Sequence, residues 1–237
     1  MEDPHLREAT ASQGLTIEEE YNMQMSWRED MDKLTFIACI PLDNGLVDGA
    51  GGGIIAAGID DPPERMIGDV NLYFFEGSDA EDEEDDDDDE DDLEDEESSS
   101  PPTATSPRLI NGELEVMIAL PRNQGRGLGK ATLLLFLAYI LRNLDNVVLG
   151  LRRPDEPVPP RLCSLRAKIS QRNRRSLGLF EGLGFKRRRG GRVNYFGEYE
   201  LGVGGVEGGL EEFRAAVDDL LLRNGMGGWK EMRYVRE

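Results

Sequence analysis

The hydrophobic positions of the chain change their period several times, and these changes predict a mixture of helices and strands. Apolar runs of strand length occur in six segments: 34–40, 66–75, 113–120, 162–169, 185–189 and 195–203. Helical periods occur in four segments: 16–32, 127–144, 174–181 and 210–223. Three strands precede the first crossover helix, so the order favours a mixed sheet with helices on both faces over a parallel dinucleotide-binding fold.

The first predicted helix has a clear start signal. Thr16 precedes it, and Glu19 follows three residues later, which is the arrangement of a capping box. Within this helix we expect Tyr21, Met25 and Trp27 to be partly buried.

The helix predicted at 127–144 is apolar on nearly every face, so we expect it at the centre of the fold. Its apolar stretch, 131–141, is too short to span a bilayer and suits a buried core helix. Residues 1–12 contain no apolar run, which predicts no secretory or mitochondrial presequence. We therefore expect a soluble, cytoplasmic protein without a membrane partner.

The net charge of -21 belongs mainly to one segment. Residues 76–97 contain 18 acidic side chains and no basic one, so the remainder of the chain is close to neutral. Such a run cannot form a core. Segments 43–63 and 145–161 are rich in glycine, aspartate or proline and are predicted to be loops, the second with a short apolar stretch at 147–151.

Histidine and cysteine are scarce. The single histidine is His5, and the two cysteines, Cys39 and Cys163, lack the spacing of a metal site. We expect no histidine-based catalytic triad and no metal centre. The cysteines fit free, buried thiols in a reducing compartment.

The segment most informative about chemistry is 121–131, Pro-Arg-Asn-Gln-Gly-Arg-Gly-Leu-Gly-Lys-Ala, between a predicted strand and a predicted helix. Glycines allow the backbone to approach a ligand and to adopt positive φ. The helix N-terminus presents unpaired N–H groups and a partial positive charge, which suit a pyrophosphate. Arg126 and Lys130 can add positive charge.

Two common phosphate-binding motifs do not fit this segment. A Walker A loop would need glycine at Gln124 and a hydroxyl at Ala131, and a dinucleotide fingerprint starting at Gly125 would need glycine at Lys130. The pattern Arg/Gln-x-x-Gly-x-Gly/Ala fits at Arg122, Gly125 and Gly127. A glycine-rich turn at a helix start, without a ligand, is the alternative.

A second block, 173–185, contains Asn173, Leu179, Gly184 and Phe185, with Ser176 where alanine is typical. Together with the glycine-rich turn it resembles the GNAT acetyltransferase superfamily. Five further stretches resemble N-acetyltransferase 9-like proteins: 8–12, 15–24, 26–30, 67–72 and 112–118.

The resemblance covers roughly residues 8–203 and implies an α/β GNAT fold, whose mixed central sheet is splayed in the middle with helices on both faces. It predicts a GNAT domain at 1–206, with disordered loop insertions at about 41–65, 76–107 and 146–161, and a C-terminal amphipathic helix and tail at 207–237. The family pattern starts with a strand ahead of Glu8, so the first strand is expected to be absent and a sheet edge exposed.

The resemblance implies acetyl-CoA as co-substrate, with its pyrophosphate on the turn after the third long strand and its pantetheine arm along that strand. The residues implied to bind it are Met117, Ile118, Arg122, Gln124, Gly125, Arg126, Gly127, Gly129, Lys130, Asn173, Ser176 and Phe180. An N–H near Ile118 would stabilise the thioester oxyanion. Many relatives have a tyrosine at the position of Phe180 that protonates the leaving thiolate, and Phe180 cannot do so.

The implied reaction is direct attack of a protein amine, an N-terminus or a lysine, on the thioester. Glu113 and Glu115 share one face of a strand and are the candidate bases, acting directly or through water. Their alternative role is to pair with nearby arginines as a structural face. The function alternatives are a catalytically weak or inactive acetyl-CoA-binding protein, and an acidic interaction protein whose acidic segment is the functional part.

Basic residues concentrate in 161–192, where 11 lysines and arginines face a single acid, Glu181. This segment can border a cofactor with several phosphate charges or form a docking surface for an acidic partner, including the acidic segment of the same chain. No nucleic-acid-binding module accompanies it, so we expect a protein or peptide amine as the partner and no nucleic acid.

Overall fold

The computed structural model describes residues 14–41, 54–76, 106–205 and 209–236. Several predictions fall outside these residues. They concern the segment before residue 14, the acidic segment between 77 and 105, and residues 42–53 of the first predicted loop.

The chain forms two compact units. The first unit contains residues 1–72, 114–139 and 214–237, and the second contains residues 73–113 and 140–213. The predicted domain boundary at residue 206 stays a prediction.

Six strands form a mixed sheet in the order β1-β3-β4-β5-β7-β6. Their bounds are Lys33–Cys39 (β1), Met66–Glu76 (β3), Leu109–Ile118 (β4), Arg161–Ser170 (β5), Lys186–Arg187 (β6) and Glu198–Gly204 (β7). β4 pairs in parallel with β5, whereas β5 and β6 each pair antiparallel with β7. The six predicted strands are therefore confirmed, with shifted ends.

The largest shifts have local causes. β7 begins at Glu198 rather than at residue 195, because Asn194 Oδ1 accepts hydrogen bonds from the backbone N–H groups of Phe196 and Glu198 and closes a turn there. β6 is short because a 3₁₀ turn, η4, follows at Arg189–Gly191. β4 begins four residues before the predicted start.

In the first unit, helix α2 (Ile17–Glu29) has the predicted capping box: Glu19 N–H donates to Thr16 Oγ1, and Thr16 N–H donates to Glu19. The predicted burial of Tyr21 and Met25 is wrong, because they are 65% and 60% exposed. The predicted partial burial of Trp27 is confirmed. The helix carries two apolar series with a spacing of four residues, and the series that it half-buries is that of Met23 and Trp27.

Helix α3 (Leu128–Arg142) is the predicted central helix. Its buried side chains in the first unit include Leu133, Leu134 and Leu137. Phe36 of β1 packs against the rings of Phe136 and Tyr139, with centroids 5.2 and 5.0 Å away. The single helices in the described residues are all too short or too polar to cross a membrane. α3 and the next helix, α4 (Leu144–Gly150), pass that test only as a pair, bent by 78°.

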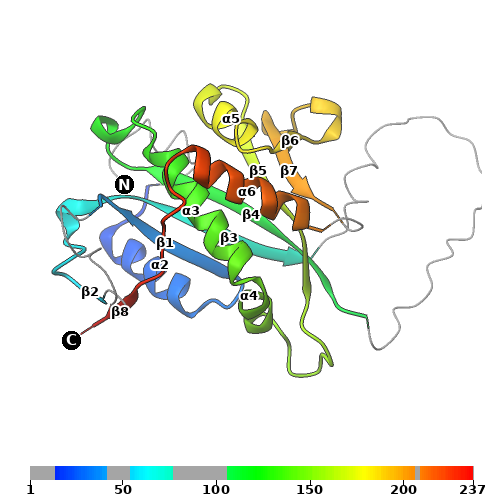
Figure 1. The fold of residues 1–237 in the computed structure, drawn as a ribbon, viewed down its shortest axis with the longest axis horizontal. Helices are drawn as coiled ribbons and strands as arrows, with labels where there is room; N and C mark the ends of the chain where they lie inside the picture. The colour runs from blue at the N-terminus through cyan, green and yellow to red at the C-terminus, as the bar shows by residue number, and fades with distance from the viewer. Residues whose placement is uncertain (1–13, 42–53, 77–105, 206–208, 237) are drawn as a thin grey trace, which may run out of the picture. The chain divides into compact units, whose positions relative to one another are not determined.

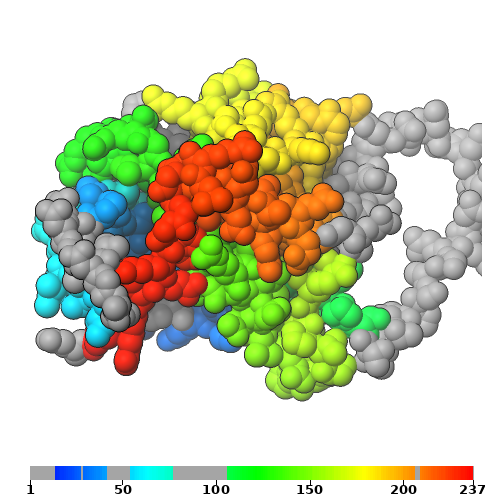
Figure 2. Space-filling model, viewed as in Figure 1, coloured from blue at the N-terminus to red at the C-terminus, as the bar shows by residue number. Residues whose placement is uncertain are grey.

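The C-terminal residues take part in the first unit. Helix α6 (Glu211–Arg223) buries Val217 and Leu221. β8 (Arg233–Val235) then pairs in parallel with β2 (Ile54–Ala56) as a separate two-stranded sheet (Figure 1). In Figure 2 the red C-terminal segment runs over the surface to the cyan residues around β2.

Segment 54–65, predicted as part of a loop insertion, thus contains β2 and a 3₁₀ turn, η1 (Pro63–Arg65). Strands of three residues are too short to show a period in the sequence. β2 is defined by its partner at the other end of the chain.

In the second unit, the predicted loop at 145–161 is wrong at its start, where helix α4 spans Leu144–Gly150. Leu144, Val147, Val148 and Leu151 recur at helical spacing, and all four are half-buried. Asn143 is the N-cap residue of α4, but its side chain makes no capping hydrogen bond to the first turn of the helix.

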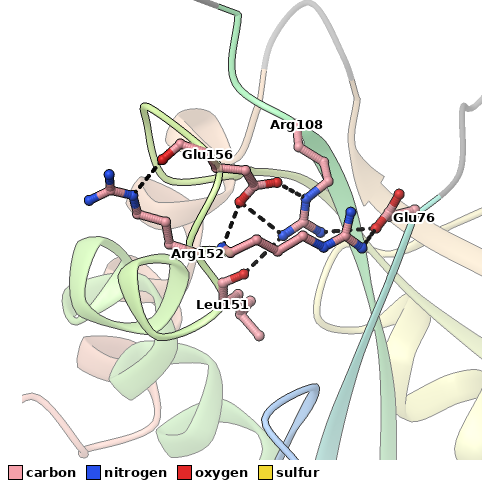
Figure 3. A network of polar contacts seen from close by, with 6 residues as sticks. Glu76, Arg108, Leu151, Arg152 and Glu156 are labelled. Carbon is pink, nitrogen blue, oxygen red and sulfur yellow. Dashed lines mark hydrogen bonds and ion pairs between the residues drawn. The ribbon is translucent and has the colours of Figure 1, made fainter.

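The rest of this segment is anchored rather than a disordered insertion (Figure 3). The Arg108 guanidinium forms an ion pair with Glu156 and donates to Leu151 O at 2.9 Å. Glu156 also accepts from Arg153 N–H at 2.9 Å, and Glu76 pairs with Arg108 at 3.2 Å. These contacts attach 151–156 to the start of β4 and the end of β3.

Candidate functional site

The turn between β4 and α3 is tied back onto β4. A 3₁₀ turn, η3 (Pro121–Asn123), leads into it, and Asn123 is buried. The Gln124 side chain donates from Nε2 to Ile118 O at 2.9 Å, and Gln124 N–H donates to Pro121 O at 3.1 Å. Gln124 therefore holds the glycine-rich turn in a fixed position relative to the end of β4.

The glycines of this turn have the backbone conformation that the sequence predicted. Gly125 and Gly127 have φ of 71° and 83°, a region that favours glycine. The N–H of Ala131 donates to Gly127 O, so the N–H groups of residues 128–130 lie ahead of the first helical bond of α3. The turn thus combines exposed glycines with the free amide end of a 15-residue helix.

The three basic side chains of the turn differ in their surroundings. Arg122 and Arg126 are exposed. Lys130 is half-buried, and its Nζ donates to Asn224 Oδ1 at 2.9 Å, just beyond the end of α6. Lys130 would have to leave this bond to contact a phosphate. Sequence reasoning missed Asn224, which lies 94 residues away in the chain.

Met117 and Ile118 are half-buried at the end of β4 in the first unit. β3 passes very close to them: a Cβ added to Gly68 would lie 1.8 Å from Met117 O. Ala119 N–H donates to Ile67 O at 2.8 Å. The backbone at Met117 and Ile118 is therefore held against β3.

The two candidate bases have different environments. Glu113 belongs to the second unit, where its Oε2 lies 3.0 Å from Arg166 Nε and 3.4 Å from Lys168 Nζ. The Arg166 guanidinium also lies over the Phe75 ring, 3.9 Å from its centroid. Glu115 belongs to the first unit and is exposed. The surroundings of Glu113 therefore match the alternative role given above, in which it pairs with nearby basic side chains.

Asn173, Ser176 and Phe180 lie in the second unit, on helix α5 (Arg174–Glu181), which is confirmed at its predicted bounds. Asn173 caps this helix, and its Oδ1 accepts from Ser176 N–H at 3.1 Å. Phe180 is 3% exposed, and its ring packs edge-on against Phe185, which packs in the same way against Phe213. Phe180 therefore has a packing role in the core of this unit.

In the ranges that the structure describes, no group of three or more histidine, cysteine, aspartate or glutamate side chains could hold a metal ion. Cys163 is buried and Cys39 half-buried, and both are free thiols.

Comparison with known proteins identifies the family. The chain is 34% identical over 201 residues to alpha/beta-tubulin-N-acetyltransferase 9 of Drosophila melanogaster, a match that covers 85% of this chain and 73% of that protein. The chain belongs to the N-acetyltransferase 9 family. An N-acetyltransferase 9-like protein of Schizosaccharomyces pombe is 32% identical over 78% of this chain and 77% of its own length. The resemblance to N-acetyltransferase 9-like proteins is thereby confirmed, and the six-stranded sheet confirms the predicted mixed α/β class.

The N-acetyltransferase 9-like protein of Caenorhabditis briggsae is 34% identical over 79% of the chain, and the match covers 66% of that relative. The chain thus spans about two thirds of the length of this relative. No protein-family model matches the chain.

Solved structures are similar at low identity. A domain from Methanocaldococcus jannaschii has a TM-score of 0.47 at 18% identity and covers 85% of both chains. A GNAT-family acetyltransferase from Streptococcus pneumoniae has a TM-score of 0.38 at 15% identity, and the match covers 81% of this chain and 78% of that one.

Proposed function

We propose that the chain transfers an acetyl group from acetyl-CoA to an amine of a protein. The observation that carries this proposal is the amide-lined turn between β4 and α3 in a member of the N-acetyltransferase 9 family. The Drosophila and human relatives are named for α/β-tubulin, so tubulin subunits are the first protein substrates to test. The choice between an N-terminal amine and a lysine stays open, and the cytoplasmic location stays a prediction.

In this proposal the turn binds the pyrophosphate of acetyl-CoA. The N–H groups of Gly125 to Lys130 and the positive end of α3 attract the phosphate oxygens, and Arg122 and Arg126 add charge at the rim. The backbone of Met117 and Ile118 would accompany the pantetheine arm. The predicted contacts of Asn173, Ser176 and Phe180 with acetyl-CoA stay predictions from the sequence.

Acetyl transfer needs a neutral amine, whose nitrogen forms a bond to the thioester carbon while the carbon–sulfur bond breaks and the thiolate leaves. A base must take the proton that the amine loses. Glu115 is the first candidate for this role because it is exposed and can be reached by an acceptor, whereas Glu113 is half-buried beside Arg166 and Lys168. Phe180 has no hydroxyl, so the thiolate must leave unprotonated or take a proton from water.

Calorimetric titration with acetyl-CoA tests donor binding. Wild type should bind, and Gly127→Asp should lose about tenfold or more in affinity, because a carboxylate in the turn repels the phosphates. Gly58→Asp is the control, since Gly58 is exposed in open space with a similar positive φ of 74°, and this variant should bind like wild type. Wild type that binds no acetyl-CoA would refute the proposed function.

Thiol release with a peptide panel tests transfer. The panel contains N-terminal peptides of α- and β-tubulin with a free amine, and lysine peptides with a blocked N-terminus. We expect Glu115→Gln to lower kcat by about 10²-fold or more while acetyl-CoA affinity is unchanged. Unchanged single-turnover acetylation in this variant would exclude Glu115 as the base.

A second candidate is an acetyl-CoA-binding protein without turnover. One observation favours it: Phe180 is a buried aromatic that has no proton to give to the leaving thiolate. Acetyl-CoA binding without thiol release for any peptide would select this candidate.

A further inference from the structure

β3 presents different chemistry on its two faces. Side chains alternate along a strand, so Val70 and Leu72 point to one side, where both are fully buried apolar residues. Asp69 and Asn71 point to the other side. The middle of a core strand thus carries an adjacent acid and amide on one face, which neither the acetyl-CoA site nor the proposed base uses.

The Asn71 side chain is buried, and only one of its two polar atoms makes a hydrogen bond to a described residue. It is 4% exposed, and its Nδ2 donates to Asp69 Oδ1 at 2.9 Å. Its Oδ1 has no hydrogen-bond partner among the described residues. A buried amide oxygen without a donor is unfavourable, so this position favours any ligand that brings an N–H group.

The hydrogen-bond partner of Asn71 is the carboxyl group of Asp69, which is partly shielded from solvent. Asp69 is half-buried, and burial raises the pKa of its carboxyl above the ordinary value, while the bond from Asn71 partly offsets that effect. An ionised carboxylate in such surroundings is stabilised by a cation that donates hydrogen bonds.

The pair lies next to the part of β4 assigned to acetyl-CoA, within the first unit. Gly68, the neighbour of Asp69, is where β3 comes against Met117 O, and Ile67 O accepts from Ala119 N–H. The strand segment that carries Asp69 and Asn71 therefore runs directly alongside the end of β4.

We propose that Asp69 and Asn71 bind the primary amine of the acceptor, an inference that rests on the proposed function. A primary ammonium group has three N–H donors and one positive charge. The acceptor binds in its protonated form, with one N–H paired with the Asp69 carboxylate and another with Asn71 Oδ1. The ammonium group then gives one proton to water before its nitrogen attacks the thioester, and the proposed base takes the second proton. An alcohol brings one donor and no charge, so the pair selects amines over hydroxyl groups.

Side-chain amide signals of Asn71 give a direct test in the ¹⁵N-labelled full chain, with assignment by Asn71→Leu. The probes are n-butylamine at neutral pH, where it is protonated, and n-butanol as its neutral counterpart. We expect butylamine to shift the Asn71 signals with saturation and butanol to leave them in place. Asp69→Asn, which keeps the shape and removes the charge, should abolish the shift, whereas Asp145→Asn on the exposed face of α4 should retain it.

Kinetics provide the second readout. Asp69→Asn should raise the KM for the amine by about tenfold or more, since a charge-assisted hydrogen bond is lost, with an unchanged KM for acetyl-CoA. Equal shifts with butanol, or a butylamine shift that survives Asp69→Asn, would overturn the inference even if the wild type transfers acetyl groups. A butylamine shift that depends on Asp69, in a chain without thiol release, would uphold the amine site and refute the proposed acetyl transfer.

Discussion

At Gly68 the backbone of β3 comes so close to β4 that no side chain fits. A Cβ at this position would lie 1.8 Å from Met117 O and 2.9 Å from Met117 C. Both neighbours are backbone atoms, so neither can move without shifting a strand. This glycine therefore sets the spacing of two core strands at the end of β4 that is proposed to meet acetyl-CoA.

We expect Gly68→Ala to lower the free energy of unfolding by about 1–3 kcal/mol or more, because the strands must separate. Gly178→Ala is the matched control: Gly178 lies inside α5 with open space around it, and alanine there should stabilise by about 0.5–1 kcal/mol. Urea denaturation of both variants measures the two changes. Equal stabilities of Gly68→Ala and wild type would contradict the close approach.

Asp69 should make the stability of the chain depend on pH. Burial raises the pKa of its carboxyl above 3.8, so the folded state favours the protonated form. Stability from this group is present at pH values below 3.8 and is lost as the pH rises through the folded-state pKa. At pH 7 the ionised carboxylate therefore destabilises the fold.

Asp69→Asn should accordingly raise the Tm at pH 7 and have little effect at pH 3, measured by thermal unfolding at both values. If Asp69 is a binding residue, this variant should be more stable than wild type and should bind the amine less tightly. A lower Tm at pH 7 would show that the carboxylate stabilises the fold.

At the scale of elements, the segment between α4 and β5 is fixed by the polar contacts of Arg108 rather than by apolar packing. The hydrogen bond from Arg108, reinforced by Arg153 N–H, lowers the pKa of Glu156 to about 2. A depressed pKa of this kind means that the ionised carboxylate stabilises the folded state. That stabilisation is present above pH 4.5, the ordinary value, and is lost as the pH falls towards 2.

Glu156→Gln should therefore lower the Tm at pH 7, and the difference from wild type should shrink as the pH falls from 4.5 towards 2. Asp155→Asn, an exposed neighbour, serves as the control. A difference that is the same at pH 7 and pH 3 would point to packing rather than charge as the role of Glu156.

Helices and strands that show a hydrophobic period or a capping signal of their own could be predicted from the sequence. Elements that depend on a partner far away in the chain could not. The capping box of α2, the apolar α3 and the bounds of α5 follow from local signals. β2 and β8 are three residues each, and α4 starts without a side-chain cap. The burial pattern of α2 was misjudged because its two apolar series look equivalent until tertiary packing selects one.

The same division applies to the candidate site. Positive φ at Gly125 and Gly127 was predictable because the turn needs glycine wherever it occurs. The bond from Lys130 to Asn224 and the pairing of Glu113 with Arg166 depend on where α6 lies and on the register of β4 with β5. Neither can be obtained from a single sequence.

At the scale of the whole molecule, the two units should respond separately to the loss of the C-terminus. Deletion of residues 230–237 removes β8, and with it the pairing to β2 and the bond from the Tyr234 hydroxyl to Asp61, 2.6 Å long. We expect amide hydrogen exchange to increase at 54–61, with unchanged protection in β5 and β7 of the second unit.

Tyr234→Phe is the milder control, because it removes only the hydroxyl and should leave the strand pairing in place. Unchanged exchange at 54–61 in the truncated chain would show that β2 is ordered without β8.

The β2–β8 pairing also has a consequence for biosynthesis. Ile54 is synthesised long before its partner Arg233. Every strand of the six-stranded sheet is therefore synthesised before this small sheet can form. A bulky domain fused directly after Glu237 would lie next to β8 at the stage when β8 must pair with β2.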